Sequence, residues 1–405
     1  MQPLYLYIDV DAFFASVEQA INSALVGRPV MVGGLKHERG VVACPSYEAR
    51  ALGVKTGTSL HRAAELIPDG VFLKGDFNRY QYYSDRLYDI LYKYSPALDK
   101  ISQDEACLEI GGILRQPEEA ESLGKKLQQE VLNKLSLSTS IGIAPGKVAA
   151  KIASDFNKPF GLTILTPENI KPFFKSLPIR KIPGIGYKTE KILHEMGIRT
   201  CRQLSEVPEE YLKQIFGING LNMSAYSKGL DGIPLRDYKA IRSVNRETGF
   251  AENISSCTEL LSHYFYLLER ATAKLRNLSK QAAAVKIKFR YADFKTVEGT
   301  HRITPVSNDE NQIFPKIEKM FRSLFTRRVG IRLVGVTLYN LKNYADNETF
   351  INDRIEKDKR LLAGLDSVRS RTGFFSLMTG RTFSLSKRYN KGDTGYELRT
   401  PGLSQ

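Results

Sequence analysis

The chain has 405 residues, which is enough for two to four domains with buried cores of their own. Its 59 Lys and Arg against 44 Asp and Glu give a net charge of +15, which suits a polyanionic partner, although such a charge also serves plain solubility. The four cysteines are far apart and the five histidines lack ligand spacing, which argues against zinc binding and for the reducing cytoplasm. No signal peptide and no apolar run long enough to span a bilayer are found, which argues against membrane contact.

The first predicted element is a buried strand, Leu4–Ile8, which ends in Asp9-Val10-Asp11. Charge at the end of a buried strand of the parallel type is typical of the chemistry-bearing edge in α/β proteins. The apolar spacing then becomes helical, and the face predicted to be buried comprises Phe13, Val17, Ala20, Ile21 and Ala24. Phe14 lies about a quarter turn away, in a first turn whose free N–H groups favour phosphate, unless it is a second core residue.

Residues 29–66 predict a small lobe. Pro29–Gly34 has the pattern of a strand and turn, Gly40–Ala43 that of its partner, and Thr58–Leu66 that of a short helix. Tyr47 and Arg50 are three residues apart and share a face if that segment is helical. A phenol and a guanidinium there could bind a triphosphate; the common alternative is a surface arginine beside a half-buried tyrosine.

A pair of adjacent carboxylates follows an amphipathic helix, Asn78–Tyr94. The segment Leu98–Ile110 predicts a strand, a turn and a strand, with Asp104 and Glu105 at the turn. Strand neighbours point to opposite faces, so both carboxylates can reach one point only if the chain turns there. Two such charges are costly together unless a divalent cation neutralises them; the alternative is a solvated pair on a surface turn. With Asp9 they form the oxygen set that Mg²⁺ prefers and that two-metal phosphoryl transfer needs.

The middle of the chain predicts a change of domain. Helices are expected over Glu118–Lys134 and Lys147–Asn157, with a strand over Leu137–Ile143 between them. Gly142–Val148 is not a P-loop, because its spacing is one residue short and Val148 replaces Ser or Thr. From Asn169 the composition shifts, and a Pro-Gly-Ile-Gly turn before a helix over residues 188–196 could expose amides to a phosphate, although such turns are common. Residues 231–243 have the composition of a linker.

From Val244 the expected order is βαββαβ, which indicates a small α+β domain. Residues 242–341 hold 17 Lys and Arg against 9 Asp and Glu. Lys286, Lys288 and Arg290 alternate along one strand and so share a face, which would make a phosphate track. In the charged tail from Lys342, a short helix is expected over Leu361–Phe375 and disorder at the end.

Three segments strongly resemble the Y-family (translesion) DNA polymerases, most closely their DNA polymerase IV-like branch. They are Ile8–Glu18, Val41–Arg50 and Ser102–Ala106, in the family's order and spacing, and further matches continue to about residue 380. The resemblance implies α/β and α+β domains in a right-hand polymerase. Its parts would be a palm (1–20 and 76–168), small fingers (21–75), a helical thumb with a helix-hairpin-helix (169–230), a linker (231–243), a little finger (244–341) and a partly disordered C-terminal extension (342–405).

The resemblance also implies residue roles. Asp9, Asp104 and Glu105 would be catalytic and, with the carbonyl of Val10, would hold two Mg²⁺ ions. The nucleotide contacts would be Phe13, Phe14, Tyr47, Arg50 and Lys151, with the Phe14 ring excluding a 2′-hydroxyl; Lys151 by itself would be taken for a solvated helix lysine. The DNA contacts would be Gly184, Gly186, Lys286, Lys288 and Arg290.

Three positions depart from the family's pattern. Many relatives carry a hydroxyl residue where this chain has Cys44, so one hydrogen bond to phosphate is expected to be missing. Gln103 replaces a residue that is usually aliphatic, and Cys107 one that is usually aromatic. None of the three removes a metal ligand.

The expected activity is template-directed addition of deoxynucleotides to a primer 3′ end, with low fidelity and past damaged bases. The expected partners of this monomer are primer–template DNA and deoxynucleoside triphosphates. Relatives often bind a sliding clamp, but the chain has no clear copy of the short apolar motif they use. Two other classes stay open, a catalytically silent relative that only binds DNA or partners and a palm-type nucleotidyl cyclase. The three carboxylates argue against the first, and the basic C-terminal domain and the hairpin against the second.

Overall fold

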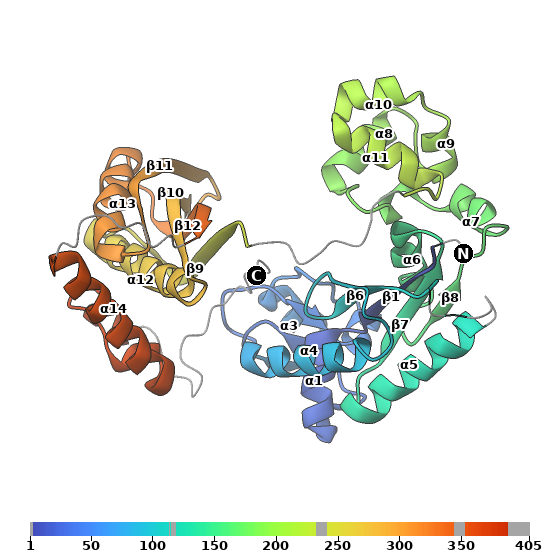
Figure 1. Cartoon of the computed structure of the whole chain (residues 1–405), viewed down its shortest axis with the longest axis horizontal. Helices are drawn as coiled ribbons and strands as arrows, with labels where there is room; N and C mark the ends of the chain where they lie inside the picture. Colours follow the sequence, from blue (N-terminus) through green and yellow to red (C-terminus); the bar gives the residue numbers. More distant parts are fainter. Residues whose placement is uncertain (1–2, 113, 115–118, 232–240, 344–352, 388–405) are drawn as a thin grey trace. The chain divides into compact units, whose positions relative to one another are not determined.

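The computed structural model describes residues 3–112, 114, 119–231, 241–343 and 353–387. The chain divides into two compact units (Figure 1). The first comprises Met1–Val32, Val42–Thr58 and Arg62–Lys239, and the second comprises Gly33–Val41, Ser59–His61 and Ala240–Gln405. None of the described helices is both long and apolar enough to cross a membrane.

A five-stranded sheet in the order β5-β6-β1-β7-β8 organises the first unit. Its strands are β1 (Tyr5–Val10), β5 (Leu98–Lys100), β6 (Glu105–Glu109), β7 (Thr139–Ala144) and β8 (Leu162–Ile164). β1 runs antiparallel to both β6 and β7, and only β7 and β8 are parallel. The expectation of a parallel-type strand before Asp9 was therefore wrong. A continuous apolar run indicates a strand that is buried on both faces. Parallel strands usually are, but an antiparallel strand between two layers of helices is buried on both faces as well.

Helices cover both faces of this sheet. α1 (Phe13–Ile21), α4 (Phe77–Leu91) and α5 (Glu119–Leu135) share a core with Leu6, Ile8 and Val10 of β1. α6 (Lys147–Ser154) packs on the opposite face, with Tyr7. Phe13 is only 3% exposed, as predicted. The helical stripe is shorter than predicted, because α1 ends at Ile21, which is 47% exposed, and a 3₁₀ turn, η1 (Ser23–Leu25), follows.

A three-stranded sheet in the order β3-β2-β4 forms a small lobe with α2 (Tyr47–Ala51) and α3 (Leu60–Leu66). β2 (Val30–Val32) pairs with β3 (Cys44–Pro45) and, in parallel, with β4 (Val71–Leu73). The partner predicted over residues 40–43 was misplaced. Val41 bridges Ser59 instead, the Ala43 amide donates to the carbonyl of Val32 at 2.8 Å, and the strand paired with β2 is Cys44–Pro45. β4 had not been predicted.

The helical part of the first unit consists of α7 (Ile170–Ser176), η2 (Ile179–Lys181), α8 (Tyr187–Glu195), α9 (Cys201–Ser205), α10 (Glu209–Phe216) and α11 (Ile218–Ser227). Phe174, Leu193 and Leu212 share one core with α6. The carboxylate of Asp231 accepts hydrogen bonds from the amides of Lys147, at 3.1 Å, and Val148, at the start of α6. Asp231, expected in the linker, therefore fastens the end of this helical part to α6, and residues 232–240 of the expected linker lie outside the described part.

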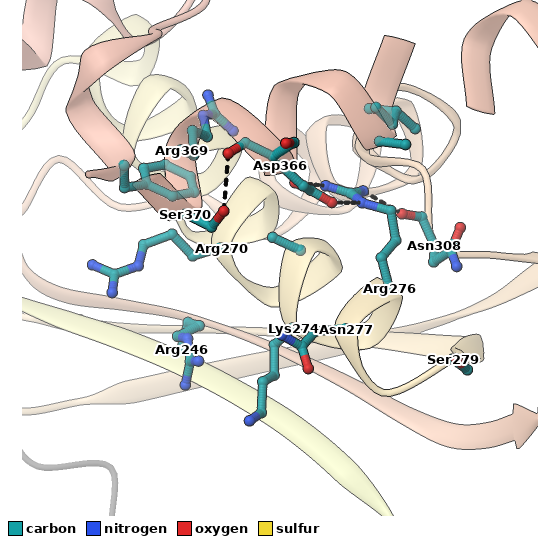
Figure 2. Close-up of a pocket in the computed structure, with 15 residues that line it drawn as sticks. Arg246, Arg270, Lys274, Arg276, Asn277, Ser279, Asn308, Asp366, Arg369 and Ser370 are labelled. Carbon is teal, nitrogen blue, oxygen red and sulfur yellow. Dashed lines mark hydrogen bonds and ion pairs between the residues drawn. The ribbon is translucent and has the colours of Figure 1, made fainter. Parts of the chain in front are cut away.

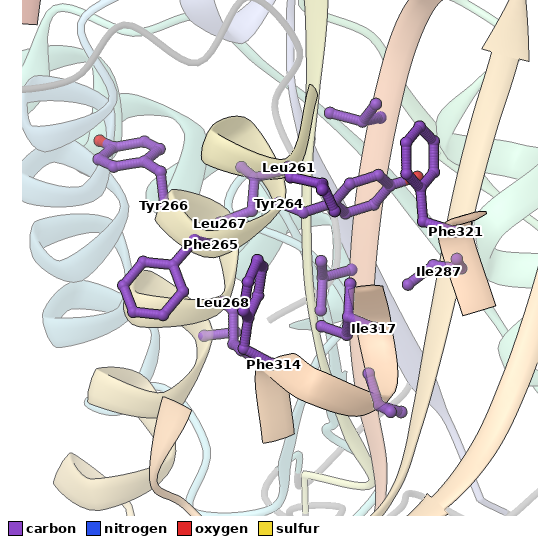
Figure 3. Close-up of a cluster of buried hydrophobic side chains, with 14 of the residues drawn as sticks. Leu261, Tyr264, Phe265, Tyr266, Leu267, Leu268, Ile287, Phe314, Ile317 and Phe321 are labelled. Carbon is purple, nitrogen blue, oxygen red and sulfur yellow. The ribbon is translucent and has the colours of Figure 1, made fainter. Parts of the chain in front are cut away.

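The second unit has the predicted βαββαβ order: β9 (Ser243–Ile254), α12 (Cys257–Asn277), β10 (Lys280–Tyr291), β11 (Thr296–Ser307), α13 (Glu310–Leu324) and β12 (Ile331–Asn343). The antiparallel sheet has the order β11-β10-β12-β9. α12 and α13 pack on one face of it through an aromatic and aliphatic core (Figure 3). Tyr264, Phe289 and Phe321 are completely or almost completely buried there.

The tail folds back onto this unit. α14 (Asp353–Thr372) is longer than the predicted helix and is followed by η3 (Phe374–Ser376) and η4 (Phe383–Lys387). Leu385, 1% exposed, belongs to the core of the unit. Arg369 forms a buried ion pair with Glu269 of α12 at 2.9 Å. The disorder expected at the end of the chain concerns residues 388–405, which lie outside the described part.

Candidate active site

Three carboxylates lie close together at one end of the five-stranded sheet, where β1 ends and β6 begins. Below, this end of the sheet is called the carboxylate edge. Asp9 near the end of β1 stands directly opposite Glu105, the first residue of β6. The amide of Val10 donates to the carbonyl of Asp104 at 3.0 Å. Asp104 lies in the turn before β6, so the predicted strand–turn–strand is present. Alternation along β1 puts Asp9 on the same side as Tyr7, facing α6.

The turn that carries Asp104 is held by its own hydrogen bonds. The amides of Ile101 and Ser102 donate to the carbonyl of Glu105 at 3.0 and 3.2 Å. The Ser102 hydroxyl donates to Asp104 Oδ1 at 2.6 Å and accepts from the Glu105 amide at 3.1 Å. The buried phenol of Tyr88 donates to the carbonyl of Ser102 at 2.6 Å. Asp104 and Glu105 are thus positioned before any ligand binds.

Two of the three carboxylates, Asp9 and Glu105, are paired with lysines. Lys158 Nζ lies 2.6 Å from Asp9 Oδ1 and 2.8 Å from Asp155 Oδ1. Lys151 Nζ lies 2.7 Å from Glu105 Oε2 and 2.9 Å from the Tyr7 hydroxyl, and that hydroxyl also donates to Glu105. Across the described residues, no three Asp, Glu, His or Cys side chains are arranged to hold a metal ion as they stand. Asp9 and Glu105 each face a lysine instead.

The electrostatics of this edge fit a divalent cation. Burial raises the pKa of Asp9 to about 7; Lys158 opposes the rise, and Glu105 and Asp104 add to it. Burial also raises the pKa of Asp104. A raised carboxyl pKa means that the ionised carboxylate is stabilised less here than in water, chiefly because it is buried and in smaller part because other carboxylates are near. A hard dication with oxygen preference would stabilise the ionised form, so the donor set fits Mg²⁺.

Asp11 has a structural role. It is 1% exposed and accepts from the hydroxyls of Ser138 and Ser140, at 2.7 and 2.8 Å, and from the Phe160 amide at 2.8 Å. The Tyr47 hydroxyl completes the set at 3.3 Å. With its oxygens occupied, Asp11 fixes the turn into α1 rather than joining the three carboxylates.

The expected triphosphate pair, Tyr47 and Arg50, shares one side of α2. The Arg50 guanidinium carbon lies 4.8 Å from the centre of the Tyr47 ring, and its Nε donates to the carbonyl of Pro45 at 3.1 Å. Burial, followed by the charge of Asp11, raises the pKa of Tyr47 to about 12. The phenol therefore stays protonated and can donate a hydrogen bond. Their contact with a triphosphate stays a prediction.

Phe14 is half-buried and held by aromatic neighbours. Its ring stacks on Tyr80 with centroids 4.3 Å apart and meets the edge of Phe77 at 5.8 Å. The Tyr80 hydroxyl in turn donates to buried Glu18 at 2.8 Å. These contacts leave the Phe14 ring little freedom to move aside. That rigidity is what a steric gate needs.

The three departures from the family's pattern lie in different surroundings. Cys44 is 8% exposed; burial raises the pKa of its thiol, while backbone amides of Ala15 and Phe14 oppose the rise. Cys107 is fully buried on the α6 side of the sheet, where burial raises its pKa to about 12. Gln103 is in the turn and donates to Gln81 at 3.0 Å. None of them displaces a carboxylate.

The residues expected to contact DNA lie in two places. Gly184 has φ +93°, and a Cβ there would meet no atom within 4 Å, as also at Gly186. Only glycine adopts that φ readily, so Gly184 allows the exposed hairpin turn before α8 to form. Lys286, Lys288 and Arg290 share the sheet face opposite α12 and α13.

This cationic row is partly compensated. Lys286 lies 3.4 Å from Glu298 on β11, and Lys288 lies 3.0 Å from Glu247 on β9. Arg290 Nε donates to the Thr296 hydroxyl at 3.0 Å. The sequence predicted correctly that the three cations share one face. It could not predict their carboxylate partners, because these lie on other strands and alternation within one strand says nothing of its neighbours.

Sequence reasoning missed several residues around the three carboxylates. Lys158 follows α6 in a loop, and no periodic pattern marks it. Tyr7 had been treated only as part of a buried strand. Ser102 and Tyr88 support the turn through contacts that depend on strand pairing. The sequence offers only an indirect signal for these residues: three carboxylates lying close together require cations nearby.

Comparisons with known proteins agree with this geometry. A model described as the impB/mucB/samB family matches residues 8–155, and its C-terminal domain matches residues 241–349. A model described as the DNA polymerase-iota thumb domain matches residues 180–231.

Curated relatives match nearly the whole chain. DNA polymerase IV of Dehalococcoides mccartyi (strain CBDB1) is 34% identical over 385 residues, covering 95% of this chain and 98% of its own. DNA polymerase IV of Listeria welshimeri is 33% identical over 337 residues, covering 83% of this chain and 95% of its own.

Solved structures with the same fold include a Y-family DNA polymerase chimera, at TM-score 0.77, and DinB from Sulfolobus solfataricus, at TM-score 0.58. Each is 26% identical and covers 84% of this chain and 99% of its own.

The fold and the site define the class of protein: a right-hand polymerase with palm, fingers, thumb and little finger. Its features here are a sheet with three carboxylates at one end, a helical part that matches a thumb domain, and a basic α+β unit. Polymerases of this class depend on metal ions. The chain belongs to the Y-family of DNA polymerases, in the DNA polymerase IV branch.

Proposed function

We propose that this chain extends a primer 3′ end on a DNA template with deoxynucleotides, and does so past damaged template bases with low fidelity. The convergence of Asp9, Asp104 and Glu105 at one sheet edge carries this proposal. Its relatives bear the name DNA polymerase IV, and one structural neighbour is an insertion ternary complex of a DNA polymerase, at TM-score 0.60.

The three carboxylates and the carbonyl of Val10 would hold two Mg²⁺ ions. When bound, the ions supply charge stabilisation at the primer 3′-oxygen and at the leaving pyrophosphate. The chain's own part is positioning: hydrogen bonds fix the turn of Asp104, and strand pairing fixes Asp9 against Glu105. Lys151 and Lys158 neutralise these carboxylates and would serve the triphosphate once the carboxylates hold metal.

The nucleotide would lie against α1 and α2. The first-turn amides of Phe13 and Phe14, with Tyr47 and Arg50, would bind the triphosphate. The Phe14 ring, fixed by Tyr80, would abut C2′ of the sugar and exclude a ribose hydroxyl.

DNA would be held by the amides around Gly184 and Gly186 and by the face with Lys286, Lys288 and Arg290. We propose the division into palm, fingers, thumb, linker, little finger and extension with the boundaries given above. The protein would act in the cytoplasm as a monomer, and a sliding clamp is a further partner to test.

Primer extension on a defined template, with Mg²⁺ and four deoxynucleoside triphosphates, tests the proposal. Template-dependent lengthening, lost with EDTA, is expected. A protein that binds primer–template but never extends it would be a silent relative. Cyclic nucleotide formed without a primer would indicate a cyclase.

A further inference from the structure

The helix α6 brings Lys151 to the carboxylate edge, but its first turn is capped from outside the helix. The residue before the helix is Gly146, which has no side chain to accept from the first amides. The carboxylate of Asp231, 84 positions after Lys147, accepts instead from the amide of Lys147 at 3.1 Å and from the amide of Val148. An acidic group there satisfies amides that lack partners within the helix, and it interacts favourably with the helix dipole.

Gly146 leaves the space that this contact needs. A Cβ at that position would lie 2.9–3.1 Å from the carboxylate atoms of Asp231. Because its φ of −127° is open to any residue, the contact depends on the missing side chain and not on the backbone conformation. Burial raises the pKa of Asp231, while the amides of Val148, Lys147 and Ala149 oppose the rise. These amides therefore stabilise the charged form of the cap.

One face of α6 is bonded to both strands of the hairpin that carries Asp104. Lys147 and Lys151 are four residues apart and so lie on the same face of the helix. Lys147 pairs with the buried Asp99 of β5, and Lys151 Nζ lies 2.7 Å from Glu105 Oε2 at the start of β6. These two ion pairs flank the turn of Asp104. A helix advances about 1.5 Å per residue, so a small shift of α6 along its axis would separate Lys151 from Glu105.

We propose that Asp231 is a positioning residue for nucleotide insertion: as the cap of α6, it holds Lys151 in place beside Glu105. Asp231 follows α11, directly before residues 232–240. The cap therefore ties the position of Lys151 to the end of the helical part of the first unit. This role goes beyond the site residues named above, and it rests on the proposed polymerase reaction.

The first test is single-turnover insertion by Asp231→Ala, at saturating DNA and over a range of nucleotide concentrations. The maximum rate should fall about 10- to 100-fold, because small misplacements of catalytic groups cost rates of this order. Binding of the next nucleotide to a dideoxy-terminated primer–template, which cannot react, should weaken about tenfold as Lys151 moves. The melting temperature should fall by about 2–4 °C, and DNA affinity should stay at the wild-type value.

A second variant, Gly146→Ala, keeps the aspartate and pushes its carboxylate away from α6. It should slow insertion and weaken nucleotide binding as Asp231→Ala does. In the Asp231→Ala background the added methyl group meets no carboxylate, so Gly146→Ala should then have little further effect. Such non-additivity is expected of two residues that act through one contact.

The matched control is Asp366→Ala in the second unit. Asp366 also bonds a residue far away in the sequence, Arg276, at 2.5 and 2.9 Å, and it fastens α14 to α12 (Figure 2). Both residues belong to the second unit, whereas α6 and the carboxylate edge belong to the first. The control should lower the melting temperature but keep the wild-type maximum rate and nucleotide affinity.

Wild-type rates and nucleotide affinity in both Asp231→Ala and Gly146→Ala would overturn the inference. An equal loss in Asp366→Ala would overturn it too, because general destabilisation would then be the cause. Weakened DNA binding with normal insertion at saturating DNA would assign Asp231 to DNA binding instead. If the wild type never extended a primer, the polymerase proposal would fail, whereas wild-type extension with unaffected variants would refute only the positioning role.

Discussion

Phe14→Ala should admit ribonucleotides. In the wild type the ring is fixed by stacking on Tyr80 at 4.3 Å and by an edge contact with Phe77 at 5.8 Å. Removing a ring that a 2′-hydroxyl would strike should reduce sugar discrimination about 10- to 200-fold. The loss of three aromatic pairs, with Phe13, Phe77 and Tyr80, should destabilise the protein by about 1.5–4.5 kcal/mol, so the variant should still fold.

Phe13→Ala is the matched control. Phe13 is 3% exposed and faces the core, so truncation should cost about 3–5 kcal/mol. It should leave the sugar preference of the surviving folded protein unchanged. A second control, Tyr80→Phe, keeps the stacking ring and loses only the hydrogen bond to Glu18.

The assay measures single-nucleotide insertion of matched deoxy- and ribonucleoside triphosphates on one primer–template. The ratio of their kcat/KM values is compared among wild type and the three variants, with melting temperatures measured alongside. If Phe14→Ala left that ratio at the wild-type value, another residue would have to be the gate and the role of the Tyr80 stack would be wrong.

Three further results are expected. Replacing Lys286, Lys288 and Arg290 by Gln should reduce the slope of log affinity against log salt by up to about 2.7, less if the paired lysines contribute weakly; an unchanged slope would place DNA elsewhere. The pKa of Asp9 is raised from 3.8 to about 7, so between these pH values the metal-free folded protein binds more protons than the unfolded chain. The folded protein therefore becomes less stable as the pH rises through this range. The Mg²⁺-induced rise in melting temperature should then be larger at pH 8 than at pH 6, and equal shifts at both would contradict it. Leu385→Ala should lower the stability of the second unit by about 2–5 kcal/mol, and unchanged melting would mean the tail is not part of its core.

Local patterns predicted much of the framework. The βαββαβ order followed from period and length, and the buried side of α1 from the spacing of Phe13 and Val17. The turn that brings Asp104 beside Glu105 followed from the geometry of adjacent strand residues. These features depend on residues close in sequence.

What failed depends on distant pairing. The direction of β1 is set by which strands flank it, and an apolar run does not encode that. The partner of β2 was misplaced because the register depends on the loop after Val32. Lys158 could not be assigned to Asp9, since the loop that carries it approaches the edge only in the folded chain. The folding of α14 onto α12 rests on ion pairs between residues about 90 to 100 positions apart.

The central claim is that Asp9, Asp104 and Glu105 form one metal-dependent catalytic site. The most direct test is single-turnover extension by Asp104→Asn and Glu105→Gln, with DNA affinity measured by fluorescence anisotropy and with Asp69→Asn as an exposed control. We expect extension to be slowed by about 10³-fold or more, with DNA affinity nearly unchanged and the control active. Near-normal extension by either variant would contradict it.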